Sequence, residues 1–243
     1  MFAGPRELEV SEMSVPDPPW QQRAARKRSA KRPLDTDVIV RTALELTDRE
    51  GLDAVSMRRV AQELGTGAAS LYAYVRNKSE LQELMLDLVI GEVPLPEPDP
   101  ARWEEQLKQF ARDQLRVFTA HPGMAQVVAR TPAPTGPNAL QVTETMLTLL
   151  RGAGLPDRIA AFAVDLLALY PNAIALERTA DFALTDGERD ERMSQVEDYF
   201  AALPAERFPN LLAILPVMMS DEGEERFEFG LELIMRGLRS WVE

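Results

Sequence analysis

Six positive charges fall within ten residues near the start of the chain, where residues 23–32 read R-A-A-R-K-R-S-A-K-R. Cations at this density attract polyanions, and such a segment can follow the phosphates of a nucleic acid or enter its minor groove. A run of this kind is also common as a solvated tail without a partner. Its position directly before Pro33 and a predicted helical module favours a contacting arm, with Arg28, Lys31 and Arg32 as candidate contacts.

The charge of the chain is divided between a basic module and an acidic body. Residues 20–78 hold 12 basic and 7 acidic residues, whereas residues 79–243 hold 14 basic and 28 acidic ones. The acidic body repels nucleic acid, so only the basic module can approach phosphate, and the repulsion biases its orientation. The acidic surface also serves solubility, and that interpretation stays open beside the first.

Two short helical patterns meet at Gly65 within S-M-R-R-V-A-Q-E-L-G-T-G-A-A-S-L-Y-A-Y-V-R-N-K, residues 56–78. Ser56 can cap the first pattern, and Gly65 can leave a helix without steric strain. A second helix is predicted over residues 68–75. Val60, Ala61 and Leu64 repeat at helical spacing on one face of the first pattern, and the second pattern is predicted to bury Leu71 and Val75. This spacing is typical of a helix-turn-helix, although an ordinary helical hairpin would also fit it.

The segment L-Y-A-Y-V-R-N-K-S-E-L, residues 71–81, resembles the signature of the tetracycline-repressor family of bacterial transcription regulators. Upstream, G-L-D-A-V-S-M-R-R-V-A, residues 51–61, is similar to that family's approach to its first reading helix. The resemblance implies that residues 68–75 enter the major groove of double-stranded DNA. It further implies that Tyr72, Tyr74 and Lys78 contact phosphates or base edges, and that Arg58 reaches a base.

The predicted reading helix begins with side chains that read bases weakly. Ala68 and Ala69 offer only methyl groups, and Ser70 is the only short polar side chain beside them. We therefore expect modest direct readout, with thymine methyl contacts, Arg58 and the basic arm supplying more of the selectivity. Ser56 completes the set of candidate DNA contacts.

Three later motifs look like the ligand-binding half of the subgroup named for the tetracycline repressor: residues 91–103, 131–140 and 225–234. This resemblance implies a homodimer that binds a palindromic operator and leaves it when a small-molecule effector binds. The helix predicted over residues 156–181 and the last helix resemble the family's four-helix interface. The apolar residues of the last helix are Phe227, Phe229, Leu231, Leu233, Ile234, Leu238 and Trp241, and a buried core explains them equally well.

The effector site departs from its nearest resemblance. The tetracycline repressor holds its drug as a magnesium chelate through a histidine, with help from a glutamate. Glu177 matches that glutamate by context, but Val127 or Val128 stands where the histidine should be. We therefore expect a mostly apolar organic effector bound without metal, with Asn172 and Glu177 as polar anchors. The candidate lining, which also fits a plain core, is Trp103, Phe110, Met124, Val128, Phe162, Leu166 and Tyr170.

Composition excludes several other kinds of protein. The 243 residues include no cysteine and one histidine, which excludes disulfides, thiolate metal sites and most histidine-based metal clusters. We find no nucleophile elbow, phosphate loop, dinucleotide fingerprint or zinc-protease motif, so we expect neither an enzyme nor a cofactor. The acidic N-terminus does not resemble a secretory signal, and polar residues interrupt the apolar run 159–176. These features predict a cytoplasmic protein without a membrane partner.

The fold class expected is all-α, with about ten helices and no strands. We expect a disordered tail and basic arm over residues 1–32, a helix-turn-helix domain over 33–78, and a ligand-binding and dimerisation domain over 79–243. Helices are predicted at 35–50, 79–90, 101–120, 123–130, 138–152, 156–181, 205–219 and 223–242, with Ser79 and Gln82 as a capping box and 183–198 as a mobile loop. A dimeric helical scaffold without effector-controlled DNA release remains the alternative function.

Overall fold

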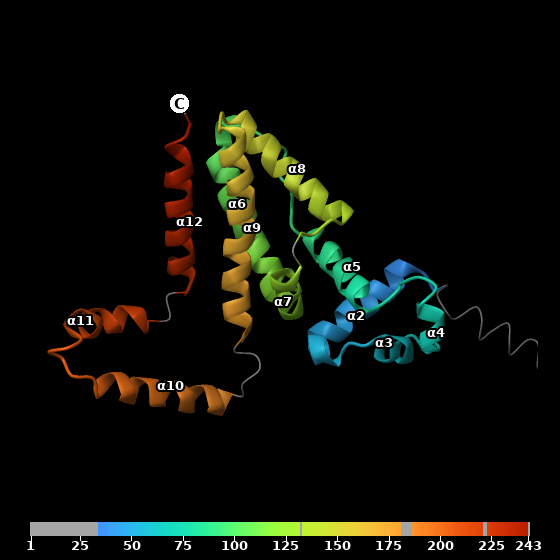
Figure 1. Ribbon diagram of the computed structural model, residues 1–243, viewed down its shortest axis with the longest axis horizontal. Coiled ribbons are helices and arrows are strands. Elements are labelled where there is room, and N and C mark those ends of the chain that lie inside the picture. The colour runs from blue at the N-terminus through green and yellow to red at the C-terminus, as the bar shows by residue number, and fades with distance from the viewer. Residues whose placement is uncertain (1–33, 132, 181–185, 221–222, 243) are drawn as a thin grey trace, which may run out of the picture. The chain divides into compact units, whose positions relative to one another are not determined.

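The computed structural model describes residues 34–131, 133–180, 186–220 and 223–242 of the chain (Figure 1). Over these residues the secondary structure consists of eleven α helices and two short 3₁₀ helices, without a strand. The all-α prediction is therefore confirmed. The basic arm, with Arg28, Lys31 and Arg32, lies outside the described residues, and the domain limits at 32 and 78 stay predictions.

Three helices form a small head at the start of the described chain: α2 (Thr36–Glu50), α3 (Met57–Glu63) and α4 (Ala68–Leu71). The predicted inner face of α2 is confirmed, because Ile39, Ala43 and Leu46 are buried. Gly51 ends α2 with a φ of 86°, a left-handed conformation that glycine adopts without strain. The short 3₁₀ helix η1 (Leu52–Ala54) then leads into α3.

Helix α5 (Lys78–Ile90) connects this head to the rest of the chain. It packs against α2 on one side and against α6, α7 and α8 on the other, with Leu81, Met85 and Val89 buried. The proline-rich segment that follows contains no helix until the 3₁₀ helix η2 (Pro100–Arg102), as its four prolines predict.

Helix α9 (Asp157–Ala180) is the centre of the larger half. It packs against α6 (Trp103–Ala120), α7 (Pro122–Arg130), α8 (Pro137–Gly152) and α12 (Gly223–Arg239), and Figure 1 shows α12 alongside α9. Residues 157–179 are long and apolar enough to cross a membrane, but many of them form the core of this helical domain.

Helices α10 (Asp186–Ala201) and α11 (Pro209–Met218) lead away from α9 and return to α12 (Figure 1). The prediction of a mobile loop over residues 183–198 is wrong from Asp186 onwards. Helix α10 has only a short apolar stripe, Met193, Val196 and Phe200, within a charged sequence that favoured a loop. Polar side chains one turn apart, such as Glu191 and Gln195 at 3.4 Å, also support it. In α11 no residue is buried.

Candidate nucleic-acid interface and effector domain

The turn between α3 and α4 has the geometry that its sequence predicts. The Ser56 hydroxyl accepts the Arg59 amide at 3.1 Å and so caps α3. After Leu64, Gly65 adopts a φ of 60°, and the Thr66 amide donates back to the Ala61 carbonyl at 2.9 Å. These hydrogen bonds pair backbone groups at the two ends of α3 that would otherwise lack a partner, and the turn at Gly65 sets the direction in which α4 begins.

Helix α4 presents the candidate reading side chains outward. Leu71 and Val75 are fully buried, as predicted, whereas Ala69 and Ser70 are exposed and Ala68 is half-buried. The predicted helix over residues 68–75 is too long, because α4 ends at Leu71. The Tyr74 amide then bonds the Leu71 carbonyl at i+3, which tightens the chain into a turn.

The two tyrosines of this turn are the large exposed side chains of the head. Tyr72 is 53% exposed and Tyr74 is 44% exposed, which leaves both phenol groups available to a ligand as large as a DNA backbone. Lys78 begins α5 next to them and is half-buried. The structure therefore exposes Ser70, Tyr72 and Tyr74 at and just after the end of α4, with Lys78 half-buried at the start of α5.

Adjacent arginines of α3 have different environments. The guanidinium of Arg59 lies between Glu63, at 2.8 Å, and Glu50 of α2, at 2.6 Å, and these hydrogen bonds raise its pKa. Arg49 joins the same cluster through Glu63 at 3.1 Å. Arg58 is exposed and has no ion pair among the described residues, so its five donors are free. Sequence reasoning missed this cluster, although the i, i+4 spacing of Arg59 and Glu63 signals one of its pairs.

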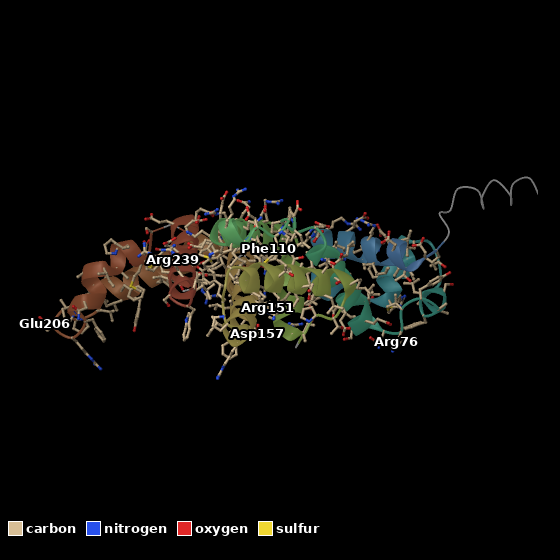
Figure 2. The ribbon with its side chains drawn as sticks, turned by 90° about the horizontal axis from the view of Figure 1, so that it is seen from above. Arg76, Phe110, Arg151, Asp157, Glu206 and Arg239 are labelled. Carbon is tan, nitrogen blue, oxygen red and sulfur yellow. The ribbon has the colours of Figure 1, made fainter. Side chains whose placement is uncertain are left out.

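The start of α5 is capped differently from the prediction. Asn77 accepts the Glu80 amide at 2.9 Å, and Glu80 accepts the Arg76 amide at 2.5 Å in return. The predicted box of Ser79 and Gln82 is therefore wrong by two residues. Glu80 also pairs with the Arg76 guanidinium at 3.1 Å, so this cation, which follows the reading turn in sequence, already has a partner. Figure 2 labels Arg76.

The effector candidates divide into two groups according to their burial. Trp103, Phe110 and Met124 are buried within the larger half, and Val128 is half-buried. Phe110 also borders a hollow of about 210 Å³ that Pro94, Leu95 and Gln106 help to line. Tyr170 stacks on Phe227 at 5.5 Å and donates its hydroxyl to the Phe227 carbonyl at 3.0 Å.

Two candidate lining residues do not lie between the helices of this chain. Phe162 is 59% exposed and Leu166 is 44% exposed on one face of α9. The prediction that they line an internal cavity does not hold within a single subunit. The apolar residues of α9 alternate around the helix, and the sequence could not tell which face the other helices cover.

The two predicted polar anchors also differ. Asn172 is 4% exposed, and its amide lies 3.5 Å from the Ala125 carbonyl, but its Oδ1 atom has no hydrogen-bond partner. A buried acceptor without a partner is unfavourable, and a bound donor would relieve it. Glu177 is exposed and pairs with Arg226 at 2.8 Å, so the structure does not bring it together with Asn172. The described residues contain no cluster of three metal-ligating side chains.

Comparison with known proteins matches both halves of the chain. The model of bacterial regulatory proteins of the tetR family matches residues 39–85, and the model of the tetracyclin repressor-like C-terminal domain matches residues 95–242. The HTH-type transcriptional repressor DrrR1 of Streptomyces coeruleorubidus is 34% identical over 92% of this chain and 84% of its own. Tetracycline repressor protein class D of Escherichia coli is 28% identical over 84% and 88%.

Solved structures give the same result. The Streptomyces coelicolor TetR family protein ActR, in complex with actinorhodin, superposes with a TM-score of 0.79 and 45% identity. The match covers 86% of this chain and 96% of that one. ActR has also been solved in complex with (S)-DNPA, with a TM-score of 0.76.

Proposed function

Because the chain belongs to the tetR family of bacterial regulatory proteins, whose members bind DNA and regulate transcription, we propose that it is a repressor that binds a palindromic operator as a homodimer and leaves it when a small-molecule effector binds. The observation that carries the proposal is the exposure of Ser70, Tyr72 and Tyr74, together with an exposed Arg58 that has no ion pair among the residues the structure describes. These groups supply donors for phosphates and one planar cation for a base edge.

A dimer is supported by an apolar surface on two neighbouring helices. Phe162 on α9 and Phe229 on α12 are 59% and 65% exposed, and Leu166 and Leu169 of α9, Leu233 of α12 and Trp241, just after α12, are exposed as well. Of the last helix, Phe227, Leu231 and Leu238 are buried within their own subunit, so only part of the predicted face is free for a partner. A second copy of the chain would cover the exposed part, and two reading heads could then engage half-sites about 10 base pairs apart.

The oligomeric state is tested by Leu233→Arg, which places a charge in this surface. Light scattering should give about twice the subunit mass of 27.2 kDa for the unaltered protein and the subunit mass for the variant. Leu140→Arg changes an equally exposed leucine on α8 and should leave the dimer intact. A subunit mass for the unaltered protein at micromolar concentration would exclude the dimer.

The effector proposed is a mostly apolar organic molecule bound without metal, and the complex of ActR with actinorhodin supports a small-molecule effector. Trp103, Phe110, Met124, Val128 and Tyr170 remain the proposed lining, and the unpartnered Oδ1 of Asn172 would accept a hydroxyl or amide donor from the effector. Glu177 is paired with Arg226, so it could bind the effector only if this exposed ion pair were broken. Such an effector would favour the conformation whose reading heads do not fit the operator.

The function is tested by selecting DNA from a random-sequence pool with the purified protein and mapping the fragments retained. Two inverted half-sites should emerge, and actinorhodin or a related organic molecule should release the fragment. Release by tetracycline that requires magnesium would show that the proposed pocket chemistry is wrong. Retention of the operator with every compound tested would favour constitutive DNA binding. Because the proposed function is exerted on DNA, we also propose that the protein is cytoplasmic.

A further inference from the structure

His121 lies at the corner where the larger half touches the head. It ends α6 and precedes Pro122, the first residue of α7. Its Nδ1 atom lies 2.8 Å from Oδ2 of Asp48, near the end of α2, and its Nε2 atom lies 3.1 Å from Oε2 of Glu92, just after α5. One imidazole therefore joins three segments that are far apart in the sequence.

The contact around His121 is also sterically tight. Gly123, two residues later, approaches α2 so closely that a Cβ built on it would lie 2.3 Å from Cγ2 of Thr47. Thr47 is buried and its hydroxyl donates to the Ala43 carbonyl of its own helix at 2.9 Å, so it has little freedom to move. The start of α7 is thus seated directly against the last turn of α2.

The imidazole can bridge both carboxylates fully only when it carries a proton on each nitrogen. A neutral imidazole has only one N–H group. Its other nitrogen is then a hydrogen-bond acceptor that faces a carboxylate, which is also an acceptor, so that hydrogen bond cannot form. The hydrogen bond to Asp48 is the main reason that the pKa of His121 is raised above 6.5, with Glu92 adding to the effect and partial burial opposing it. Arg41 of α2 is a positively charged group close to this site. It pairs with Asp37 of its own helix and is also attracted by Glu92.

We propose that His121, held between Asp48 and Glu92, is a proton-dependent latch that fixes the reading head to the effector-binding half. This inference rests on the proposed function, since it takes the head to be the part that binds DNA. With the imidazolium in place, the head keeps the position seen here; when the proton leaves, one bridge is lost and the head gains freedom. An operator that selects the latched position therefore binds more weakly as the pH rises.

The direction of the pH effect follows from the raised pKa of His121. Because the pKa of the latched His121 is raised, the latch contributes fully below about pH 6.5 and is lost as the pH rises through the higher pKa of the latched form. Each latch exchanges one proton, so by linkage the operator affinity falls by at most about tenfold per pH unit for each latch within that interval.

The first experiment observes the histidine directly. Since the chain contains one histidine, its Cε1–H resonance in a proton NMR titration of the whole protein is unambiguous once any purification tag is removed. We expect a pKa above 6.5 that falls in Asp48→Asn and in Glu92→Gln. Glu45→Gln removes an exposed carboxylate from the same helix α2 and should leave the titration unchanged. An unshifted pKa, or an equal change in the control, would overturn the latch whatever the protein binds.

The second experiment measures operator affinity from pH 6 to pH 8.5 at constant ionic strength, with a fragment obtained by selection. The unaltered protein should lose affinity several-fold as the pH rises, whereas His121→Gln should show a nearly flat profile close to the weaker limit. Parallel profiles for the two proteins would contradict the latch. If the unaltered protein binds no DNA at any pH, the proposed function fails, while the NMR titration still decides whether the latch exists.

Discussion

Gly230 of α12 faces Tyr170 of α9 so closely that a Cβ built on the glycine would lie 2.1 Å from the Tyr170 hydroxyl oxygen and 2.6 Å from Cζ. This close approach allows the Tyr170 hydroxyl to donate to the Phe227 carbonyl of α12 and the Tyr170 ring to stack on the Phe227 ring. The backbone of α12 therefore lies against α9 at Gly230, a position without a side chain.

We predict that Gly230→Ala destabilises the protein, although alanine usually stabilises a helix relative to glycine. The new methyl group must displace the tyrosine ring, which is held by a hydrogen bond and a buried partner. Gly237→Ala on the same helix meets no atom within 4 Å and should raise stability by about 0.4–1 kcal/mol. Thermal unfolding of both variants checks the contrast; similar shifts for the two would contradict it.

Asp87 of α5 caps the start of α8 from another helix. Its Oδ1 atom accepts the Ala139 amide at 3.0 Å, its Oδ2 atom accepts the Asn138 side-chain amide at 3.0 Å, and the residue is 9% exposed. Asp87→Ala leaves these donors without a partner and should lower the free energy of unfolding by about 1–3 kcal/mol in urea titrations. Glu83→Ala, an exposed residue one turn earlier, should change it little.

Three ion pairs join α6 to α12: Glu104 with Arg239, Lys108 with Glu232, and Arg112 with Glu228. Hydrogen bonds to the basic partners lower the pKa of all three glutamates, that of Glu232 to about 2. Lowered pKa values stabilise the fold above about pH 4.5, the ordinary glutamate value, and this stabilisation is lost as the pH falls through the lowered values.

We therefore predict that Glu228→Gln flattens the decline of the melting temperature between pH 5 and pH 3. The expected change is modest, because the Arg112–Glu228 pair is more than a third exposed and solvent screens it. Glu225→Gln, an exposed glutamate of the same helix, should leave the decline unaltered. Equal flattening in both variants would argue against a role for the pair.

Substitution of the two neighbouring arginines of α3 should affect different properties, DNA binding for Arg58 and stability for Arg59. Arg58→Ala removes a free cation and should weaken binding to the selected operator by about 1–3 kcal/mol, with relaxed selectivity at one base. Lys78→Ala should weaken binding to all DNA sequences alike. Arg59→Ala breaks the pairs with Glu50 and Glu63 and should mainly lower the melting temperature. Competition binding with random DNA, together with thermal unfolding, separates the three outcomes.

Local chemistry made the head predictable from the sequence. The hydroxyl of Ser56, the left-handed glycine at position 65 and the buried Leu71 and Val75 each act within a few residues, so spacing alone identifies them. The end of α4 and the cap of α5 were misplaced for a related reason. Asn77 and Ser79 are both good caps, and a difference of two residues depends on how the preceding turn closes.

Tertiary structure decided which faces are covered and which charges meet. The sequence contains enough apolar residues on α9 to bury either face, and only the positions of its neighbours leave Phe162 and Leu166 outside. Helix α10 was missed because its apolar stripe, Met193, Val196 and Phe200, is short and stands in a charged sequence. Asp48 and His121 are separated by 73 residues, and no periodicity links them. Helical periodicity is a local property of the chain, whereas an ion pair across such a separation exists only once the helices between have packed.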